Sequence, residues 1–385
     1  MPLPFDPNLP NQYDKRLVPH LVSKNFMREV MYESPLKMFM GSDVNALINL
    51  SYKAPGTGRE DTVALVRDHN YKKLIYDYDQ ITGKGSAMTF YADEIKARQS
   101  SLQPIVIQGL KLQKYDTPIK IADEARPLLK DALKRNIEYS LIKNATIDAY
   151  PDLTVGPDKT RAYFNGVPAA NGNPANYDNN IARGIAAMGG ADAQHSGCSV
   201  DSILQLKFLA MNGFREGTLD GANFERKITP YRRKYVHGYG AETFVYFMSP
   251  ATYRSMRKDP EWAQYFYRGM KEEGQPSLLH TSRLRGVLED ILLIELPSLA
   301  ETEFMIKGAG NSTNVAAWNL FCGAQAFSIL FCGEPWFTSE ITNHENNMEI
   351  ALQNIRGHKA HIFPSKRSPN IFVENAIIHN FVQIG

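Results

Sequence analysis

The sequence predicts an α+β fold, on three observations. One long stretch after Asp123 carries apolar residues at every fourth position, which is typical of an amphipathic helix. Short segments rich in β-branched and aromatic residues lie on both sides of that stretch. The chain shows neither an internal repeat nor a regular series of strand–helix–strand units, which disfavours a solenoid or a parallel α/β sheet.

The N-terminal stretch predicts an extended arm. It contains prolines at five positions, namely Pro2, Pro4, Pro7, Pro10 and Pro19. Proline fixes φ and lacks a backbone donor, so such a segment becomes ordered only by lying on its own fold or on a neighbour. Residues 22–50 follow, and the helical spacing of Val22, Phe26 and Val30 predicts one or two short helices there.

A polar β-rich zone comes next, after a loop at 53–60. Strands are predicted at 61–67, 86–91 and 104–108, and the alternation in residues 111–121 predicts that the β pattern continues to Ile121. The zone has little apolar area to bury by itself. Two interpretations remain open: a pair of surface hairpins, or a projecting loop that gains its burial from a neighbouring subunit.

The long helix is predicted from Asp123 to about Tyr150. Arg126–Pro127 would occupy the first turn, where proline is tolerated. The apolar positions on its buried face are Leu129, Leu133, Ile137, Leu141, Ala145 and Ala149, broadened by Leu128, Ala132, Tyr139 and Ile142. At a rise of 1.5 Å per residue, about 23 residues would make a rod of roughly 35 Å.

The remaining chain alternates predicted loops, helices and strands. Residues 151–197 are rich in Gly, Pro and Asn and predict a loop, with mobility expected at 184–197. An amphipathic helix is predicted at 199–211, with Ile203, Leu204, Leu206, Phe208 and Leu209 as its apolar positions. A continuous apolar run at 243–248 predicts a strand buried on both faces.

Further elements are predicted toward the C-terminus. Ser249–Pro250 would open a helix that runs through Arg257, and Asp259–Pro260 would open another through Gly269. The predicted β segments are 287–296, 320–331, 347–364 and 371–381.

Composition limits the classes of function. The 385 residues are 43% hydrophobic and 22% charged, with a net charge of +2, so the chain lacks the bulk basic charge that drives nucleic-acid binding. Three cysteines, Cys198, Cys322 and Cys332, fit small buried hydrophobes in a reducing compartment. Neither a signal peptide nor an apolar run long enough for a membrane span is evident, so we expect a soluble protein.

Three motifs resemble chemical sites but lack a feature that the chemistry requires. Residues 54–59 resemble a phosphate loop, but Arg59–Glu60 stand where Lys and Ser/Thr are required. His358 and His361, near a third histidine and a glutamate at 344–345, lack the convergence of a metal site. The Gly-rich segment 308–313 does not enter a clear helix. We therefore expect no catalytic residue, no cofactor and no metal.

Basic and aromatic residues are the best candidates for contacts with other molecules. The segment 228–235 combines arginine with tyrosine, which are enriched at protein interfaces, although it could also touch nucleic acid. The lysines of the β-rich zone are a second such group. The residues predicted as subunit contacts are Lys72, Lys73, Lys84, Arg98, Tyr231, Arg232 and Arg233.

The order of several segments resembles a known family. Residues 111–121 lead directly into the long helix, and Thr229–Pro230 precedes a strand that ends in Ser249–Pro250. The further matching segments are Asp259–Trp262, Arg285–Glu295, Cys322–Ala326 and Asn354–Lys359. From about residue 61 to residue 381 the chain is similar to the major capsid proteins of N-four-type tailed bacteriophages, which have the HK97-like capsid fold.

The resemblance implies a domain organisation for the chain. Residues 1–55 would form an N-terminal arm with short helices, and 56–121 an extended β-hairpin loop. Residues 122–198, continued by 336–385, would form a peripheral domain with a long spine helix, and 199–335 an axial domain. Copies would assemble into hexamers and pentamers of an icosahedral head around double-stranded DNA, which they would contact only weakly and without sequence specificity.

The same resemblance implies partners and a location. Scaffolding and portal proteins, and in some relatives decoration proteins, would bind the shell, which would assemble in the host cytoplasm and end in the virion. No membrane would be involved. Two alternatives remain open: a soluble α+β enzyme, and another self-assembling virion structural protein.

Overall fold

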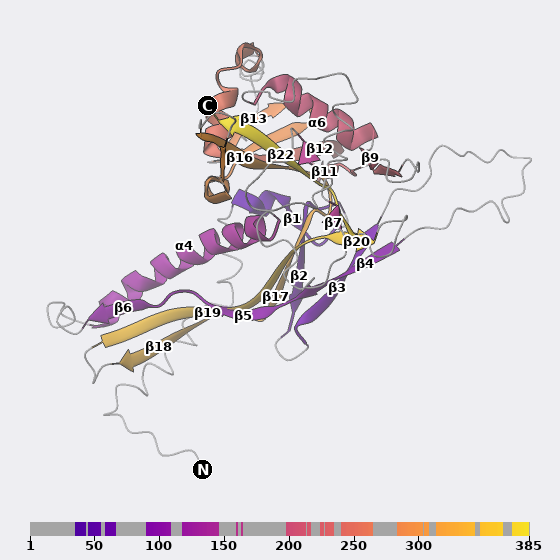
Figure 1. Cartoon of the computed structure of the whole chain (residues 1–385). Helices are drawn as coiled ribbons and strands as arrows, with labels where there is room; N and C mark the ends of the chain where they lie inside the picture. The colour runs from indigo at the N-terminus through magenta and orange to yellow at the C-terminus, as the bar shows by residue number, and fades with distance from the viewer. Residues whose placement is uncertain are drawn as a thin grey trace, which may run out of the picture.

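The structure is a computed structural model of the chain. It describes residues 35–43, 45–54, 58–66, 90–108, 118–145, 159–160, 163–164, 198–212, 214–216, 224–226, 228–234, 240–264, 283–302, 304–307, 313–342, 347–364 and 372–384. The predicted N-terminal arm and the segment 184–197 therefore lie outside the described residues. Figure 1 shows two bodies, a rounded one that holds the C-terminal strand and an elongated one along helix α4 (Pro118–Ala145).

The elongated body is a seven-stranded sheet with α4 packed along it (Figure 1). Its main path runs β1-β2-β17-β19-β18, and β5 and β6 pair with β19 as well. The strands are β1 (Met40–Gly41), β2 (Ile48–Lys53), β5 (Arg98–Ser101), β6 (Ile105–Gln108), β17 (Phe327–Cys332), β18 (Trp336–Thr342) and β19 (Asn347–Ala360). The 14-residue β19 is the central strand of this sheet, because β5, β6, β17 and β18 all pair with it. Five of its alternate side chains from Met348 to Arg356 are buried.

Helix α4 confirms the predicted apolar face. Leu129, Leu133, Ile137, Leu141 and Ala145 are all buried, and Ile142 joins them. Leu128 is 63% exposed and Ala132 is also exposed, so the face is narrower than predicted. The 28-residue helix would measure about 42 Å at 1.5 Å per residue.

The start of α4 corrects two predictions. The helix begins at Pro118, so residues 118–121 are helical and do not continue the β pattern. Pro127 consequently lies inside the helix and not in its first turn. Its ring is exposed, and its missing donor leaves the carbonyl of Asp123 without the usual helical hydrogen bond. The alternation of polar and apolar residues in 111–121 gave a wrong prediction for 118–121, because the period of a short polar segment is weakly defined.

Residues 22–50 also differ from the prediction. Within the described part of that range, a short 3₁₀ helix η1 (Pro35–Phe39) is followed by the strands β1 and β2. Strand β2 lies parallel to β17, from Ile48 beside Phe327 to Lys53 beside Cys332. The central position in a sheet therefore decided the structure of 48–50, where the local sequence pattern predicted a helix.

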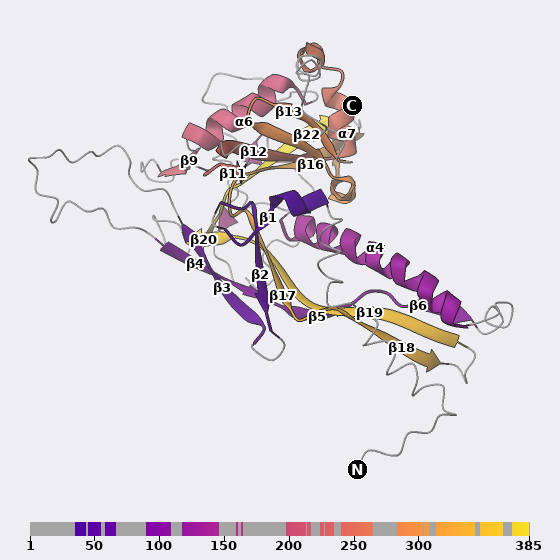
Figure 2. The ribbon, with the colours of Figure 1, turned by 180° about the vertical axis from the view of Figure 1, so that it is seen from behind.

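A two-stranded hairpin projects from the elongated body (Figure 2). It consists of β3 (Glu60–Val66) and β4 (Phe90–Lys96), which pair antiparallel along their whole length. Strand β3 confirms the predicted strand at 61–67, and β4 begins near the end of the one predicted at 86–91. Val63 and Ile95 pack with Leu330 and Cys332, so a small separate apolar cluster holds the hairpin on β17.

The rounded body is built on an eight-stranded sheet. Its main path is β13-β14-β12-β16-β22-β8, with β11 beside β12 and β15 beside β16. The strands are β8 (Tyr163–Phe164), β11 (Tyr231–Lys234), β12 (Gly240–Met248), β13 (Leu284–Leu288), β14 (Ile291–Glu295), β15 (Phe304–Lys307), β16 (Thr313–Cys322) and β22 (Ile377–Ile384). Phe244 to Met248 are buried, as predicted for the apolar run at 243–248.

Helices occur in the rounded body at positions that the sequence predicted. α6 (Val200–Asn212) matches the helix predicted at 199–211, although its Phe208 is 55% exposed. α7 (Pro250–Met256) begins at the N-cap Ser249, whose side chain accepts a hydrogen bond from the Thr252 N–H. Residues 260–264 begin the helix predicted after Asp259, and the carboxylate of Asp259 also accepts from Val200 N at 2.8 Å, at the start of α6.

The remaining elements are short. η3 (Pro297–Thr302) follows β14. β9 (Phe214–Glu216) pairs with β10 (Phe224–Arg226), and β20 (Ile362–Pro364), β21 (Phe372–Glu374) and β7 (Lys159–Thr160) form a three-stranded sheet. The loop predicted at 151–197 thus contains two short strands, β7 and β8, that pair with the C-terminal segments.

The segment 323–326 carries the chain from one sheet to the other. The single buried strand region predicted at 320–331 is in fact two strands, because β16 belongs to the eight-stranded sheet and β17 to the seven-stranded one. A Cβ on Gly323 would stand 2.4 Å from the carbonyl oxygen of Thr229, so only glycine fits there. Backbone bonds from Ala324 N to Thr229 O and from Gln325 N to Ala46 O fix the crossing.

Candidate functional site

Among the predicted contact residues, those that the structure describes do not form one site. Lys72, Lys73 and Lys84 lie outside the described residues. Arg98 is exposed on β5, opposite Arg356 of β19. Tyr231 is only 8% exposed, and its hydroxyl donates to the carbonyl of Met38 at 2.8 Å. Arg232 and Arg233 lie in β11, opposite Glu242 and Ala241. Their role as subunit contacts stays a prediction.

A buried polar cluster joins the β3–β4 hairpin to the seven-stranded sheet. Asp93 of β4 accepts a hydrogen bond from Lys359 Nζ at 2.6 Å and lies 3.1 Å from Nδ1 of His361. The other ring nitrogen of His361 is hydrogen-bonded to the hydroxyl of Ser328 in β17. The His361 imidazole therefore joins Asp93 of β4 to Ser328 of β17, although these residues are distant in sequence. The two hydrogen bonds fix the orientation of the ring and hold β4 on the sheet.

Ser328, His361 and Asp93 are hydrogen-bonded in the same sequence as the serine, histidine and aspartate of a hydrolase triad. Unlike the serine of such a triad, Ser328 is not accessible to a substrate. His361 is fully buried, Ser328 is 1% exposed and Asp93 is 7% exposed, so a substrate cannot reach the serine. Burial alone would raise the pKa of Asp93, but the hydrogen bond from His361 and the charge of Lys359 outweigh it and lower that pKa. The carboxylate is therefore held charged, as a structural anchor requires.

A second polar seam lies between α4 and β19. Arg356 donates to the side-chain oxygen of Asn136, and Asn144 donates to the carbonyl of His358 at 3.0 Å. One nitrogen atom in each of Asn354, Arg356 and His358 is buried and has no hydrogen-bond partner among the described residues. These residues alternate along β19 and so share one face of the strand.

The seam places a buried cation without an acidic partner in the described part of the chain. Burial lowers the pKa of Arg356 to about 10, which still leaves the guanidinium charged at neutral pH. Burial, followed by the charge of Arg356, lowers the pKa of His358 well below its ordinary value, so this imidazole is neutral. The α4–β19 contact is therefore less favourable than an apolar contact of the same size.

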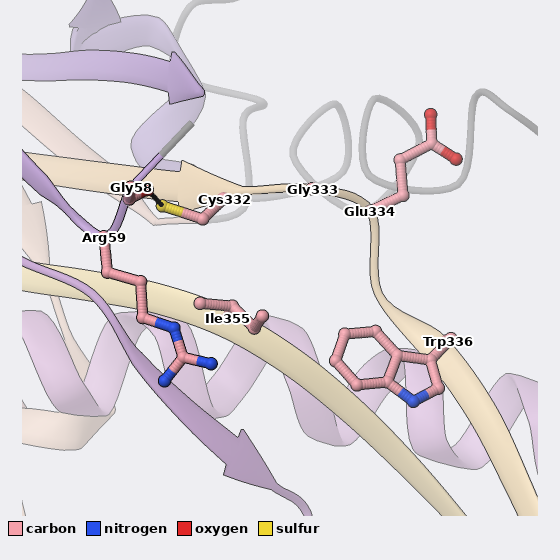
Figure 3. Close-up of a pocket in the computed structure, with 7 residues that line it drawn as sticks. All are labelled: Gly58, Arg59, Cys332, Gly333, Glu334, Trp336 and Ile355. Carbon is pink, nitrogen blue, oxygen red and sulfur yellow. Dashed lines mark hydrogen bonds between the residues drawn. The ribbon is translucent and has the colours of Figure 1, made fainter. Parts of the chain in front are cut away.

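A pocket opens on the elongated body where β17 gives way to β18 (Figure 3). Its volume is about 470 Å³, and it is lined by Gly58, Arg59, Cys332, Gly333, Glu334, Trp336 and Ile355. The strands β17 and β18 both pair with β19, from Phe331 opposite Arg356 to Trp336 opposite Gln353. Residues 332–335 therefore lie opposite only two residues of β19, 354–355. This bulge, which includes Gly333 at φ 87°, moves the chain away from the backbone of β19.

Side chains of contrasting character line this pocket. In Figure 3 the guanidinium of Arg59 and the indole of Trp336 flank Ile355, whereas the carboxylate of Glu334 points away from them. Arg59 and Glu334 are exposed, while Trp336 and Ile355 are half-buried. The pocket can therefore hold an apolar or aromatic side chain on Ile355 and a carboxylate beside Arg59.

Sequence reasoning missed this pocket. In the sequence, Arg59 is notable only as a departure from a phosphate loop, and no pattern distinguishes Trp336 or Ile355. The signal was present in Gly333–Pro335, a glycine and a proline that interrupt the β pattern between 327 and 342. What the pattern could not predict is that Gly58 and Arg59, which immediately precede β3, line the same pocket as this interruption.

The three cysteines agree with the expectation from the sequence. Cys198, Cys322 and Cys332 are free and buried, as predicted. Within the described ranges, no group of three His, Cys, Asp or Glu residues is arranged to hold a metal ion. Among the same residues, no helix is long and apolar enough to cross a membrane.

Comparison with known proteins identifies similar chains. Residues 23–366 match the model of a protein family described as phage capsid protein. No curated protein sequence matches the chain.

Solved structures are similar over almost the whole length. A chain in the structure of the capsid of Ralstonia phage GP4 is 17% identical with a TM-score of 0.60, and the match covers 91% of each chain. The head structure of Helicobacter pylori bacteriophage KHP40 is 11% identical with a TM-score of 0.59, covering 92% of this chain and 91% of that one. The capsid of cyanophage Pam1 is 15% identical with a TM-score of 0.55, covering 92% and 93%.

Proposed function

The chain belongs to the phage capsid protein family, and on this premise we propose that it is the major structural subunit of an icosahedral phage head. It has the HK97-like capsid fold that the sequence resemblance implied. The observation that carries the proposal is the extent of the family match, which runs from residue 23 to residue 366. The family implies a structural protein, and the soluble-enzyme alternative has no support from it.

Copies of the chain assemble into hexamers and pentamers. Physically, this function requires extended segments that gain burial from neighbours and interfaces repeated by symmetry. The β3–β4 hairpin supports it, because among its described side chains only Val63 and Ile95 belong to an apolar cluster, and that cluster is small. Exposed apolar side chains on separate elements, such as Leu128 on α4 and Phe208 on α6, are further surfaces that neighbours can cover.

We also propose a domain assignment. The peripheral domain contains α4 and the seven-stranded sheet, and the axial domain contains the eight-stranded sheet. Sheet pairing supports several shifts from the borders inferred from the sequence. The peripheral domain gains strands that belong to the seven-stranded sheet, namely β1, β2, β5, β6 and β17, and the axial domain gains β8 and β22, which belong to the eight-stranded sheet.

The remaining parts of the proposal concern partners and location. The shell encloses double-stranded DNA and contacts it weakly, in keeping with a net charge of only +2. Scaffolding and portal proteins, and decoration proteins where present, bind the shell. Assembly takes place in the host cytoplasm, and the finished protein is located in the virion.

Electron microscopy tests the proposal directly. The purified protein is concentrated, alone and after co-expression with a scaffolding partner, and imaged by negative stain. We expect closed shells, or rings of five and six subunits. A uniform monomer or dimer under both conditions would overturn the proposal.

A further inference from the structure

Three nitrogen atoms without hydrogen-bond partners lie on one face of β19. They are Nδ2 of Asn354, Nη1 of Arg356 and Nε2 of His358, each buried and unpaired within the described ranges. The three residues alternate along the strand and therefore share a face. This face is turned toward α4, because Arg356 donates through Nη2 to the side-chain oxygen of Asn136. Buried polar atoms are almost always hydrogen-bonded in folded proteins, so three neighbouring exceptions indicate that a water or an ion binds there.

The seam between α4 and β19 carries one positive charge that no carboxylate neutralises in the described part of the chain. Arg356 is only 7% exposed. The buried carboxylates among the described residues are those of Asp93 and Glu138, and both already form ion pairs with other side chains. His358 adds no charge, because burial and the neighbouring guanidinium lower its pKa well below the ordinary value. The charge to be neutralised is therefore +1.

The unpaired groups need an acceptor that the neighbouring side chains do not supply. The side-chain oxygen of Asn136 is already shared between Arg356 and the hydroxyl of Ser140, which is 3.4 Å away. The side-chain oxygen of Asn354 accepts from Ser100 at 2.6 Å. A water molecule could accept from two donors, but it would not neutralise the guanidinium. A small anion accepts from several N–H groups and also supplies the missing charge, which a buried cation requires.

The spacing of the donors suits one small ion. Residues two apart on a strand are separated by about 6.6 Å, so an ion beside the central Arg356 lies within reach of its neighbours on the same face. Asn354 is only 3% exposed, so the seam is enclosed and excludes bulky anions.

We propose that the seam between α4 and β19 binds one small monovalent anion of the halide type. Nη1 of Arg356 and Nδ2 of Asn354 hold the anion, and the neutral imidazole of His358 donates through Nε2–H. The anion lies between the helix and the central strand of the seven-stranded sheet, so it stabilises their contact. This inference goes beyond the proposed function and does not depend on assembly.

Urea denaturation of unassembled subunits in two salts tests the proposal. The protein is unfolded at pH 7 in 0.1 M sodium chloride and in 0.1 M sodium gluconate, whose anion is too large for the enclosed seam. An anion that binds only the folded state lowers the equilibrium constant of unfolding. We expect that constant to be at least fivefold lower in chloride, which corresponds to a dissociation constant of about 25 mM or tighter. The effect should saturate as chloride replaces gluconate at constant ionic strength.

Two variants assign the effect to the seam. Arg356→Met removes the charge, so its unfolding constant should differ less than 1.5-fold between the two salts. In gluconate, where no anion compensates the guanidinium, this variant should be at least as stable as the wild type. Asn354→Asp keeps the oxygen that accepts from Ser100 and adds a negative charge beside Arg356. It should also lose the response to chloride, and it should be no less stable than the wild type in gluconate. Arg257→Met removes an exposed arginine of α7 and is the control that should respond like the wild type.

Several outcomes would overturn the proposal. Equal unfolding constants of the wild type in the two salts would mean that water alone fills the seam. A chloride response in Arg356→Met or Asn354→Asp as large as that of the wild type would mean that the ion acts elsewhere. Because every measurement uses unassembled subunits, failure of this inference leaves the proposed function intact.

Discussion

The carboxylate of Asp93 in β4 lies 3.1 Å from Nδ1 of His361, although 268 positions separate the two residues in the sequence. Through His361 the hairpin is connected to Ser328 of β17, and through Lys359 to β19. The projecting hairpin is thus anchored at its root by charge-assisted hydrogen bonds, which are stronger than neutral ones. Its small apolar cluster alone would give a weaker attachment.

Replacing this anchor should make stability depend on pH. Asp93→Asn keeps the size of the side chain but removes its charge, and we expect the free energy of unfolding to fall by about 2 kcal/mol at pH 7. The pKa of Asp93 is lowered in the folded protein, so its contribution is present above the unfolded pKa of about 3.9 and is lost as the pH falls through the folded pKa.

Urea denaturation between pH 7 and pH 3 measures this difference. The gap between wild type and Asp93→Asn should shrink below about pH 4. Glu94→Gln, at an exposed neighbouring position on the same strand, is the control and should change little. A gap that stays constant down to pH 3 would mean that the charge of Asp93 is not what anchors the hairpin.

Substitution by aspartate should have opposite effects on solubility at two leucines of α4. Leu133 is fully buried, so Leu133→Asp places an unpaired charge in the core, and we expect insoluble protein. Leu128 is 63% exposed, so Leu128→Asp should give soluble, folded subunits. Soluble yield and circular dichroism measure the contrast. Wild-type yield of Leu133→Asp would show that the buried face of α4 is misassigned.

The crossing between the two sheets should tolerate no side chain. In Gly323→Ala the new Cβ would stand 2.4 Å from Thr229 O and 2.4 Å from Ile228 Cγ2, and the backbone oxygen cannot easily move. We expect a loss of about 3 kcal/mol in thermal or urea unfolding. Gly286→Ala is the matched comparison, because the three atoms nearest to its Cβ would all belong to the indole of Trp262, the first at 2.7 Å, and none to the backbone. It should cost less, and an equal or reversed order would contradict this account of the crossing.

The buried guanidinium of Arg356 should be replaceable by an apolar side chain. Arg356→Met fills similar space and removes a charge that has no acidic partner among the described residues, so stability should stay unchanged or rise by about 1–2 kcal/mol. Arg356→Ala leaves a cavity and should be destabilising. Urea midpoints measure both. A loss above about 2 kcal/mol for Arg356→Met would mean that the charge is compensated in solution.

The cysteines should differ in their reaction with iodoacetamide at pH 8. Burial raises the pKa of the Cys198 thiol to about 12, so almost none of the reactive thiolate is present. Cys332 lines the open pocket, and although burial raises its pKa too, we expect at least tenfold faster alkylation there. Peptide mass spectrometry identifies the modified site. Equal rates at the two cysteines would indicate that the pocket is closed in solution.

The sequence by itself determined the elements whose pattern is local. The buried face of α4 follows from apolar residues at every fourth position, and the central strand β12 follows from a continuous apolar run at 243–248. The N-cap Ser249 followed by Pro250 likewise defines the start of α7. In each case neighbours along the chain carry the information, because helical and strand periods are properties of short segments.

Tertiary structure decided which segments meet. Residues 48–50 became a strand because β17 offers them a place in a sheet, and 320–331 became two strands because the chain crosses between sheets at Gly323. The meeting of Asp93 with His361, and of Arg59 with Trp336 across the pocket, joins residues more than 260 positions apart. Such contacts leave no periodic signal, since only the packing of the complete chain brings their side chains together.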